Sequence, residues 1–281
     1  MSAGAPEERV WLGSGPGARV THLIRAWPAV LRVAFAGLVA YRAEMVIWVL
    51  SATLPLVMLS LWNAASTGGP VGGYDQLAFT RYFAVNLVVR QLTGSWIVWE
   101  LNWAIRKGEL SPKLLRPMNP LVYNFAETLS ALPFRAGVLL PLVGALAWWR
   151  PEVLFLPSPT VFFAFVASVL ASFILAWTVQ ALFGMLAFWF EQSMGFWSAW
   201  FAIWSLLAGY FVPLDLFPAW AVAGTRLLPF YSTLGAPIDV LLGKVDPAST
   251  LATQWGWVVA LSALAALTWR TGIRRYGAVG A

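Results

Sequence analysis

The sequence predicts an all-α membrane protein with about six transmembrane helices. Hydrophobic residues make up 60% of the 281 residues and charged residues only 11%, whereas soluble domains are typically about one-quarter charged. A soluble fold of this length could not bury so much apolar surface, but a lipid bilayer removes that need. Several stretches run for about 20 residues with few charges, the length that crosses a hydrocarbon core. The 18 tryptophans also fit, because tryptophan collects at the two membrane–water interfaces.

Six apolar segments are predicted to cross the membrane, and Gly/Pro-rich or charged segments separate them. The predicted spans are residues 43–63, 81–104, 121–148, 160–189, 194–212 and 251–269. The fourth span is too long for an untilted crossing, so we expect it to tilt or to protrude.

These spans form one predicted transmembrane domain, residues 21–270, between two tails. Residues 1–20 are polar and rich in Gly and Pro, which predicts a disordered tail and not a cleaved signal peptide. Residues 271–281 form a predicted cytoplasmic tail. In residues 21–41, Arg25 and Arg32 recur at helical spacing, which favours a helix lying along the cytoplasmic interface. The alternative is that this stretch is the lower part of a longer first span.

The distribution of the 18 lysines and arginines predicts the orientation. Most of them lie before the first span, in the loop 106–120 and in the C-terminal tail, and few lie in the other connections. Cytoplasmic segments carry the excess of positive charge, so both termini are predicted to be cytoplasmic. The net charge of +6 is therefore interpreted as a signal of topology and not of nucleic-acid binding.

Two connecting segments have unusual compositions. Residues 105–120 combine four basic residues, several Gly and Pro, and three leucines, which predicts a short amphipathic helix held between turns. Residues 213–250 contain five prolines but remain apolar. Irregular backbone cannot face lipid, so short re-entrant helices packed on protein in the outer leaflet fit this segment better than a solvated loop.

Four ionisable residues fall within predicted spans, where such residues are energetically costly and usually have a role. They are Arg90, Glu100, Glu127 and Arg135. Arg90 and Glu127 lie on antiparallel neighbours and are candidates for an ion pair, whereas Glu100 is nearer to Arg106 and Lys107. Arg90, Glu127 and Arg135 either line a substrate path or brace the two helices.

Two further patterns concern helix faces. The fourth span carries small or polar residues at every fourth position, which predicts a close helix–helix contact with this chain or with a partner subunit; they are Ala164, Ser168, Ser172, Ala176, Gln180 and Gly184. The fifth span is crowded with aromatic residues that either pack and face lipid or line a path for an apolar or cationic substrate; they are Phe196, Trp197, Trp200, Phe201 and Trp204.

The sequence lacks the common motifs of catalysis and nucleotide binding. It has no GxxxxGK[ST] loop for ATP, no HExxH and no GxSxG. It has no cysteine, and a single histidine, His22, cannot build a His-rich metal site. We therefore expect no catalytic residues, no metal site and no cofactor bound by this chain.

Several short stretches resemble the permease subunits of ABC-2 type exporters, in a branch formerly described as a family of unknown function. They are Tyr41–Arg42–Ala43–Glu44, IRKGELSPKLLRPMNP at 105–120, LAGYFVPLDLFPAW at 207–220, LPF at 228–230 and the C-terminal RRYGAVGA. They occur in the order found in that family and extend over nearly the whole chain.

The resemblance implies a six-span subunit in the bacterial inner (plasma) membrane that works in efflux with two partners. One is a second permease subunit, identical or paralogous, and the other is a separate ABC ATPase that binds ATP and Mg²⁺. The coupling helix of the family maps to residues 108–120, with Gly108, Glu109, Leu110, Leu114, Leu115, Arg116 and Pro117 as the coupling residues. The outer re-entrant helices map to residues 212–242, with Pro213, Leu214, Phe217 and Pro218 as an outer gate.

Two other functions remain as alternatives. A membrane scaffold or assembly factor without transport activity would have no ATPase partner. A membrane-embedded enzyme would need a catalytic cluster that the sequence does not supply.

Overall fold

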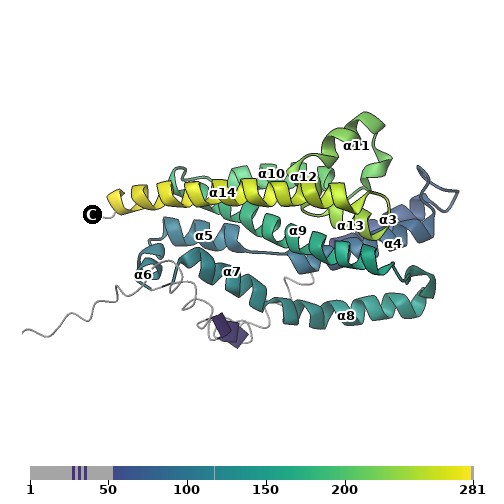
Figure 1. The fold of residues 1–281 in the computed structure, drawn as a ribbon, viewed down its shortest axis with the longest axis horizontal. Helices are drawn as coiled ribbons and strands as arrows, with labels where there is room; N and C mark the ends of the chain where they lie inside the picture. The colour runs from purple at the N-terminus through teal and green to yellow at the C-terminus, as the bar shows by residue number, and fades with distance from the viewer. Residues whose placement is uncertain (1–26, 29–30, 33–34, 37–52, 117, 280–281) are drawn as a thin grey trace, which may run out of the picture.

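The computed structural model describes residues 53–116 and 118–279, together with residues 27–28, 31–32 and 35–36. The predicted tail 1–20, most of the interfacial helix 21–41, the start of the first span and Pro117 lie outside the described residues. In the described part of the chain the long helices run roughly along one axis and there is no β-strand (Figure 1). The prediction of an all-α fold is thus confirmed.

The helices follow one another along the chain with short connections. They are α3 (Leu54–Ala65), α4 (Gln76–Thr93), α5 (Ile97–Arg106), α6 (Leu110–Leu114), α7 (Pro120–Ser130), α8 (Leu132–Trp149), α9 (Pro159–Met185), α10 (Met194–Leu207), α11 (Ala219–Arg226), α12 (Pro229–Ser232), α13 (Gly235–Leu241) and α14 (Pro247–Val279). Single 3₁₀ turns are η1 (Pro151–Val153), η2 (Leu186–Phe188) and η3 (Leu214–Leu216).

Helix α9 is the centre of the packing. It contacts α14, α5, α13, α4 and α10. Helix α6 and the C-terminal end of α14 lie at one end of the long axis, and α11 and α13 lie near the other end (Figure 1). The predicted coupling segment and the C-terminus therefore share one end, opposite the segment predicted to lie on the outer side.

Three helical stretches are long and apolar enough to cross a membrane by length and composition, namely Pro120–Trp149, Pro159–Phe188 and Pro247–Tyr276. Helices α3 and α10 are apolar but shorter. For α3 only the later part of the predicted span 43–63 is described. The last span is longer than predicted, because α14 begins at Pro247 and continues through most of the C-terminal tail.

The second and third predicted spans are each divided into two helices. Between α4 and α5, Gly94 adopts an extended conformation with ψ of 142°, and glycine is a poor helix former. Between α7 and α8 the break falls at Ala131, and Pro133 follows in the first turn of α8. A proline has no N–H to continue the helical ladder, so the chain can start a new helix there at low cost.

The small residues along α9 mainly contact other helices of the same chain. Gln254 of α14 accepts a hydrogen bond from Ser168 Oγ at 2.6 Å and donates one to Ser172 Oγ at 3.2 Å. A Cβ on Gly184 would lie 3.1 Å from Leu101 Cβ of α5, so that position needs a glycine-sized residue. At Ser168, Ser172 and Gly184, the predicted close contact is therefore with helices of this chain and not with a partner subunit.

Candidate functional site

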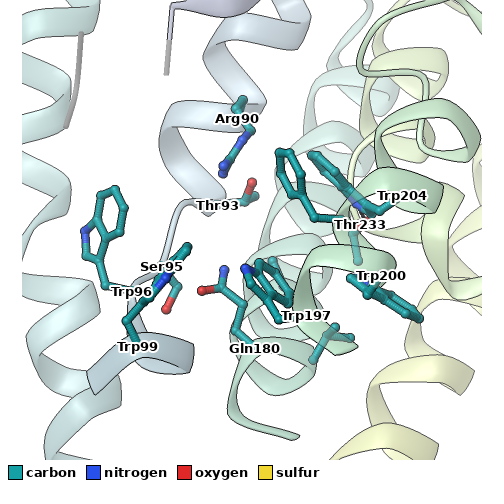
Figure 2. A pocket seen from close by; sticks show the side chains of 13 residues that line it. Arg90, Thr93, Ser95, Trp96, Trp99, Gln180, Trp197, Trp200, Trp204 and Thr233 are labelled. Carbon is teal, nitrogen blue, oxygen red and sulfur yellow. Dashed lines mark hydrogen bonds between the residues drawn. The ribbon is translucent and has the colours of Figure 1, made fainter. Parts of the chain in front are cut away.

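A pocket with aromatic walls lies where the break between α4 and α5 faces α9 and α10 (Figure 2). It contains about 570 Å³ of space, including the part open to its surroundings. Its lining side chains are Arg90, Thr93, Ser95, Trp96, Trp99, Ala176, Val179, Gln180, Trp197, Trp200, Phe201, Trp204 and Thr233. We call this set the aromatic pocket.

Helix α10 supplies one wall of the aromatic pocket because its aromatic residues recur at three- to four-residue spacing and share one face. Trp204 is held in place by a hydrogen bond from its Nε1 to Thr233 Oγ1 at 2.7 Å. Trp200 stacks on Phe230 with ring centroids 4.3 Å apart. These rings line the pocket, while Phe196 is about half exposed, and a role of this helix in a substrate path stays a prediction.

Arg90 points from α4 toward the space between these rings (Figure 2). Its guanidinium carbon lies 5.6 Å from the ring centroid of Trp204 and 5.9 Å from that of Tyr210. Its buried Nε has no hydrogen-bond partner among the described residues. Gln180 of α9 is 6% exposed, and its Oε1 likewise has no partner among them. Both side chains therefore offer unused hydrogen-bonding capacity at the pocket.

Arg135 explains why α4 can end in the middle of the predicted span. Its guanidinium donates hydrogen bonds to the carbonyl oxygens of Gln91, at 3.3 Å, and of Gly94. A helix end within the protein must have its last carbonyls satisfied, and a charged donor does this strongly. A Cβ on residue 94 would lie 3.0 Å from Nη1 of Arg135, so Gly94 also leaves room for the guanidinium.

The predicted ion pair between Arg90 and Glu127 does not form. Neither side chain makes an ion pair with any described residue. Instead Arg90 lies close enough to Arg135 for the two cations to repel, and Glu127 lies near Glu100 and Lys113. Glu100 also forms no ion pair with Arg106 or Lys107.

Residue counting explains this correction. The two spans form a hairpin around the loop 106–120, and residues at equal distance from such a loop lie at equal depth. Glu100 and Glu127 are about equally far from the loop, and so are Arg90 and Arg135 at a greater distance. The hairpin thus juxtaposes like charges, and this signal was available in the sequence.

The charge of the aromatic pocket determines which ligands it can hold. Two unit charges about 4 Å apart repel by about 4 kcal/mol at an effective dielectric constant of 20. The attraction of a cation to an aromatic face is about 0.5–2 kcal/mol. A cationic group beside Arg90 would lose more from that repulsion than it gains from the rings. The pocket is therefore better suited to an anionic or hydrogen-bond-accepting group.

A second polar cluster lies at the α11 end and consists of Tyr74, Asp215, Arg226, Asp239 and Lys244; we call it the outer network. Asp215 is 3.1 Å from Arg226 and 3.0 Å from Lys244, and it accepts a hydrogen bond from Tyr74 at 2.7 Å. Arg226 also lies 3.6 Å from Asp239. The network joins the loop before α4 to the segment 213–246, and none of these residues was identified as a site from the sequence.

Burial differs between the two carboxylates of the outer network. Burial tends to raise the pKa of Asp215, but hydrogen bonds from Tyr74 and Lys244, with the charges of Lys244 and Arg226, lower this pKa overall. Asp239 is only 4% exposed, and burial raises its pKa to about 6 despite the neighbouring cations. Asp215 is therefore the stable anion that holds the network together.

The predicted outer-gate residues lie next to the outer network. Leu214 is buried against Tyr231, Ala236 and Phe217. Short helices occupy the segment 213–246, as predicted, and their depth in the membrane remains a prediction. Pro213 and Pro218 precede η3 and α11 respectively, where their fixed φ suits the start of a helical turn. The gating role of these four residues also remains a prediction.

The predicted coupling residues form a turn followed by the short helix α6. Gly108 has φ of +78°, a left-handed conformation that glycine adopts without strain. Leu110 is fully buried among residues of α5, α9 and α14, and Leu114 packs at the edge of that cluster. Leu115 is 88% exposed. Glu109 accepts a hydrogen bond from Trp103 Nε1 at 3.2 Å, and Arg116 is exposed.

Comparison with known proteins gives one family. No curated protein matches the sequence. Residues 45–280 match the family described as ABC-2 family transporter protein. This range takes in the aromatic pocket, the outer network and the segment around α6, and the apolar helices agree with a membrane component. The chain therefore belongs to the ABC-2 transporter family and is an ABC-2 type permease.

Proposed function

We propose that this chain is the membrane-spanning subunit of an ATP-driven exporter. It pairs with a second permease subunit, identical or paralogous, and a separate ABC ATPase that holds ATP and Mg²⁺ drives the pair. It resides in the bacterial inner membrane with both termini in the cytoplasm. The family match supports the permease role, and the distribution of basic residues supports the orientation.

The proposal rests on one observation: the leucines of residues 108–116 differ in their burial. Leu110 and Leu114 pack α6 into a cluster that α5, α9 and α14 form, whereas Leu115 is 88% exposed. Leu115 directly follows α6, which the buried Leu110 anchors, so its exposed side chain is available for a protein–protein contact. Force applied to Leu115 by an ATPase would reach α5, α9 and α14 through Leu110.

In this proposal the aromatic pocket is part of the passage, and the segment with Pro213, Leu214, Phe217 and Pro218 closes its outer end. Helix α10 and the break between α4 and α5 present the pocket beside a partly exposed helix face. The second permease subunit would complete the passage by packing against that face.

The test is a comparison of two Leu→Asp variants. Leu115→Asp places a charge on the proposed ATPase contact, and Leu156→Asp places the same charge on a fully exposed leucine in the loop before α9. The tagged chain is purified in mild detergent from its native membrane. We expect an ABC ATPase to copurify with the wild type and with Leu156→Asp, and to be lost with Leu115→Asp.

Equal recovery of the ATPase with both variants would show that the contact lies elsewhere. Recovery of no ATPase with the wild type would favour the scaffold function instead. Leu110 is not used for this test, because a charge at its buried position would unfold the cluster around it.

A further inference from the structure

The basic side chains near the aromatic pocket have no acidic partner among the described residues. Arg90 lines the pocket and Arg135 lies behind it, and neither forms an ion pair in the described part of the chain. Arginine in a membrane span usually pairs with an acidic group or with backbone carbonyls, and among the described residues only Arg135 makes the second kind of contact. The described acidic residues of the neighbouring spans, Glu100 and Glu127, do not line the pocket.

The unpartnered polar atoms identify where a ligand would bind. Among the described residues, Arg90 Nε is a buried donor without an acceptor, and Gln180 Oε1 is a buried acceptor without a donor. Both residues line the pocket and come from opposite sides of it, α4 and α9 (Figure 2). Buried polar groups in native proteins are nearly always hydrogen-bonded, so two at one pocket point to a polar group of a ligand.

The tryptophans identify the rest of the ligand. Indole rings from α5 and α10 face the pocket from two directions, and Trp99 and Trp197 meet edge to face at 5.9 Å between centroids. Such walls bind a flat apolar or aromatic body by contact with the ring faces. A ligand that fits has an apolar body and a single acidic head.

We propose that the aromatic pocket binds an amphipathic anion, with the acidic group at Arg90 and the apolar body between the tryptophans. This inference rests on the proposed function, because it identifies the bound anion as the compound that the exporter transports. The same chemistry is present in a free aromatic carboxylate and in an anionic lipid headgroup with its chains. A hydrophobic cation is the ligand that the pocket selects against.

Quenching of tryptophan fluorescence by bromine tests the charge preference directly. The full-length permease, with any subunit that copurifies, is placed in phosphatidylcholine nanodiscs. Three probes of matched size are titrated: 4-bromophenylacetate, 2-(4-bromophenyl)ethanol and 2-(4-bromophenyl)ethylamine. We expect saturable quenching by the anion at a concentration at least tenfold lower than by the amine, with the alcohol between them.

Variants at Arg90 assign the preference to one side chain. Arg90→Gln is expected to reduce the preference for the anion to less than twofold, and Arg90→Lys, which keeps the charge, to retain most of it. Arg81→Gln is the matched control, because Arg81 is also on α4 but does not line the pocket and donates to the carbonyl of Glu152. Equal binding of amine and anion, or an unchanged preference in Arg90→Gln, would overturn the proposal.

Two further comparisons complete the test. The first distinguishes a lipid from a soluble anion, and the second distinguishes failure of this inference from failure of the proposed function. With phosphatidylglycerol added to the nanodiscs, a tenfold loss of affinity for 4-bromophenylacetate assigns the pocket to an anionic lipid, and unchanged affinity assigns it to a soluble anion. The quenching assay needs no ATPase. An anion preference without a copurifying ATPase would contradict the proposed function alone, and a copurifying ATPase without the preference would contradict this inference alone.

Discussion

The outer network and the centre of the bundle each bring two basic side chains together, but only the outer network also supplies carboxylates. Arg226 and Lys244 share Asp215, whereas Arg90 and Arg135 repel one another without an acid among the described residues, and only Arg135 finds carbonyl partners there. A charge compensated by its neighbours stabilises the fold. A charge without such a neighbour can instead be compensated by a bound ligand. The outer network is therefore a structural cluster, and the pocket beside Arg90 is a candidate binding site.

The largest expected effect is in the outer network, at the carboxylate that three side chains share. Asp215→Ala removes the partner of Tyr74, Arg226 and Lys244, so we expect the free energy of unfolding to fall by about 3 kcal/mol. Thermal denaturation followed by tryptophan fluorescence would measure it. Asp246→Ala is the control, because this exposed residue lies outside the network and caps the start of α14 through Ser249 N, so its loss should be clearly smaller. Equal losses in both variants would show that the network does not stabilise the fold.

The second prediction concerns Arg135, the arginine at the centre of the bundle that is hydrogen-bonded to backbone carbonyls. Arg135→Met removes the donors to the carbonyl oxygens of Gln91 and Gly94, so we expect a loss of about 2 kcal/mol in the same assay. Arg150→Met is the control, because Arg150 is exposed at the end of α8 and contacts only the ring of Trp149 among described residues. A neutral result for Arg135→Met would mean that the break between α4 and α5 does not depend on this side chain.

The raised pKa of Asp239 should make the stability of the protein depend on pH. Its pKa of about 6 in the folded protein lies above the value near 3.9 of an unfolded chain. Between pH 4 and 6 the folded state therefore holds a proton that the unfolded state has lost, and the contribution of Asp239 to stability falls as the pH rises. The slope is about 1.4 kcal/mol per pH unit at most.

The groups that face Asp239 are Tyr231, Arg226, Lys244 and Asp215. Among them only Asp215 titrates in acid, and its lowered pKa places its effect below this pH window and with the opposite sign. Thermal midpoints of wild type and Asp239→Asn from pH 4 to 6.5 isolate the contribution of Asp239. The wild type should lose stability relative to the variant as the pH rises, and parallel curves would contradict the assignment.

The smallest effect on stability is expected at Arg90. Arg90→Gln loses the contacts with the rings of Trp204 and Tyr210 but removes the repulsion from Arg135. The two changes oppose each other, so the free energy of unfolding should change by less than about 1 kcal/mol. Equal thermal midpoints of the wild type and Arg90→Gln in the absence of ligand would show that Arg90, unlike Asp215, does not stabilise the fold. A loss as large as that of Asp215→Ala would make Arg90 a structural residue.

The sequence allowed the all-α class and most of the helices to be predicted, because long apolar runs and breaking residues act locally. The short helix with Leu110 follows from three leucines between Gly and Pro, and the stripe with Ser168 and Gly184 predicts close packing. The equal depth of Arg90 and Arg135 could also have been found by counting residues from the loop 106–120. Such features depend on spacing along the chain, which the backbone geometry of helices converts directly into position.

Only the tertiary structure decided which of these residues act together. Tyr74 and Lys244 lie far apart in the sequence, and their meeting at Asp215 depends on how the segment 213–246 folds back over α4. The exposure of Leu115 beside the buried Leu110 depends on α5, α9 and α14 together. Pairing between distant segments has no local signal, because it is determined by the summed packing of whole helices and not by any one spacing.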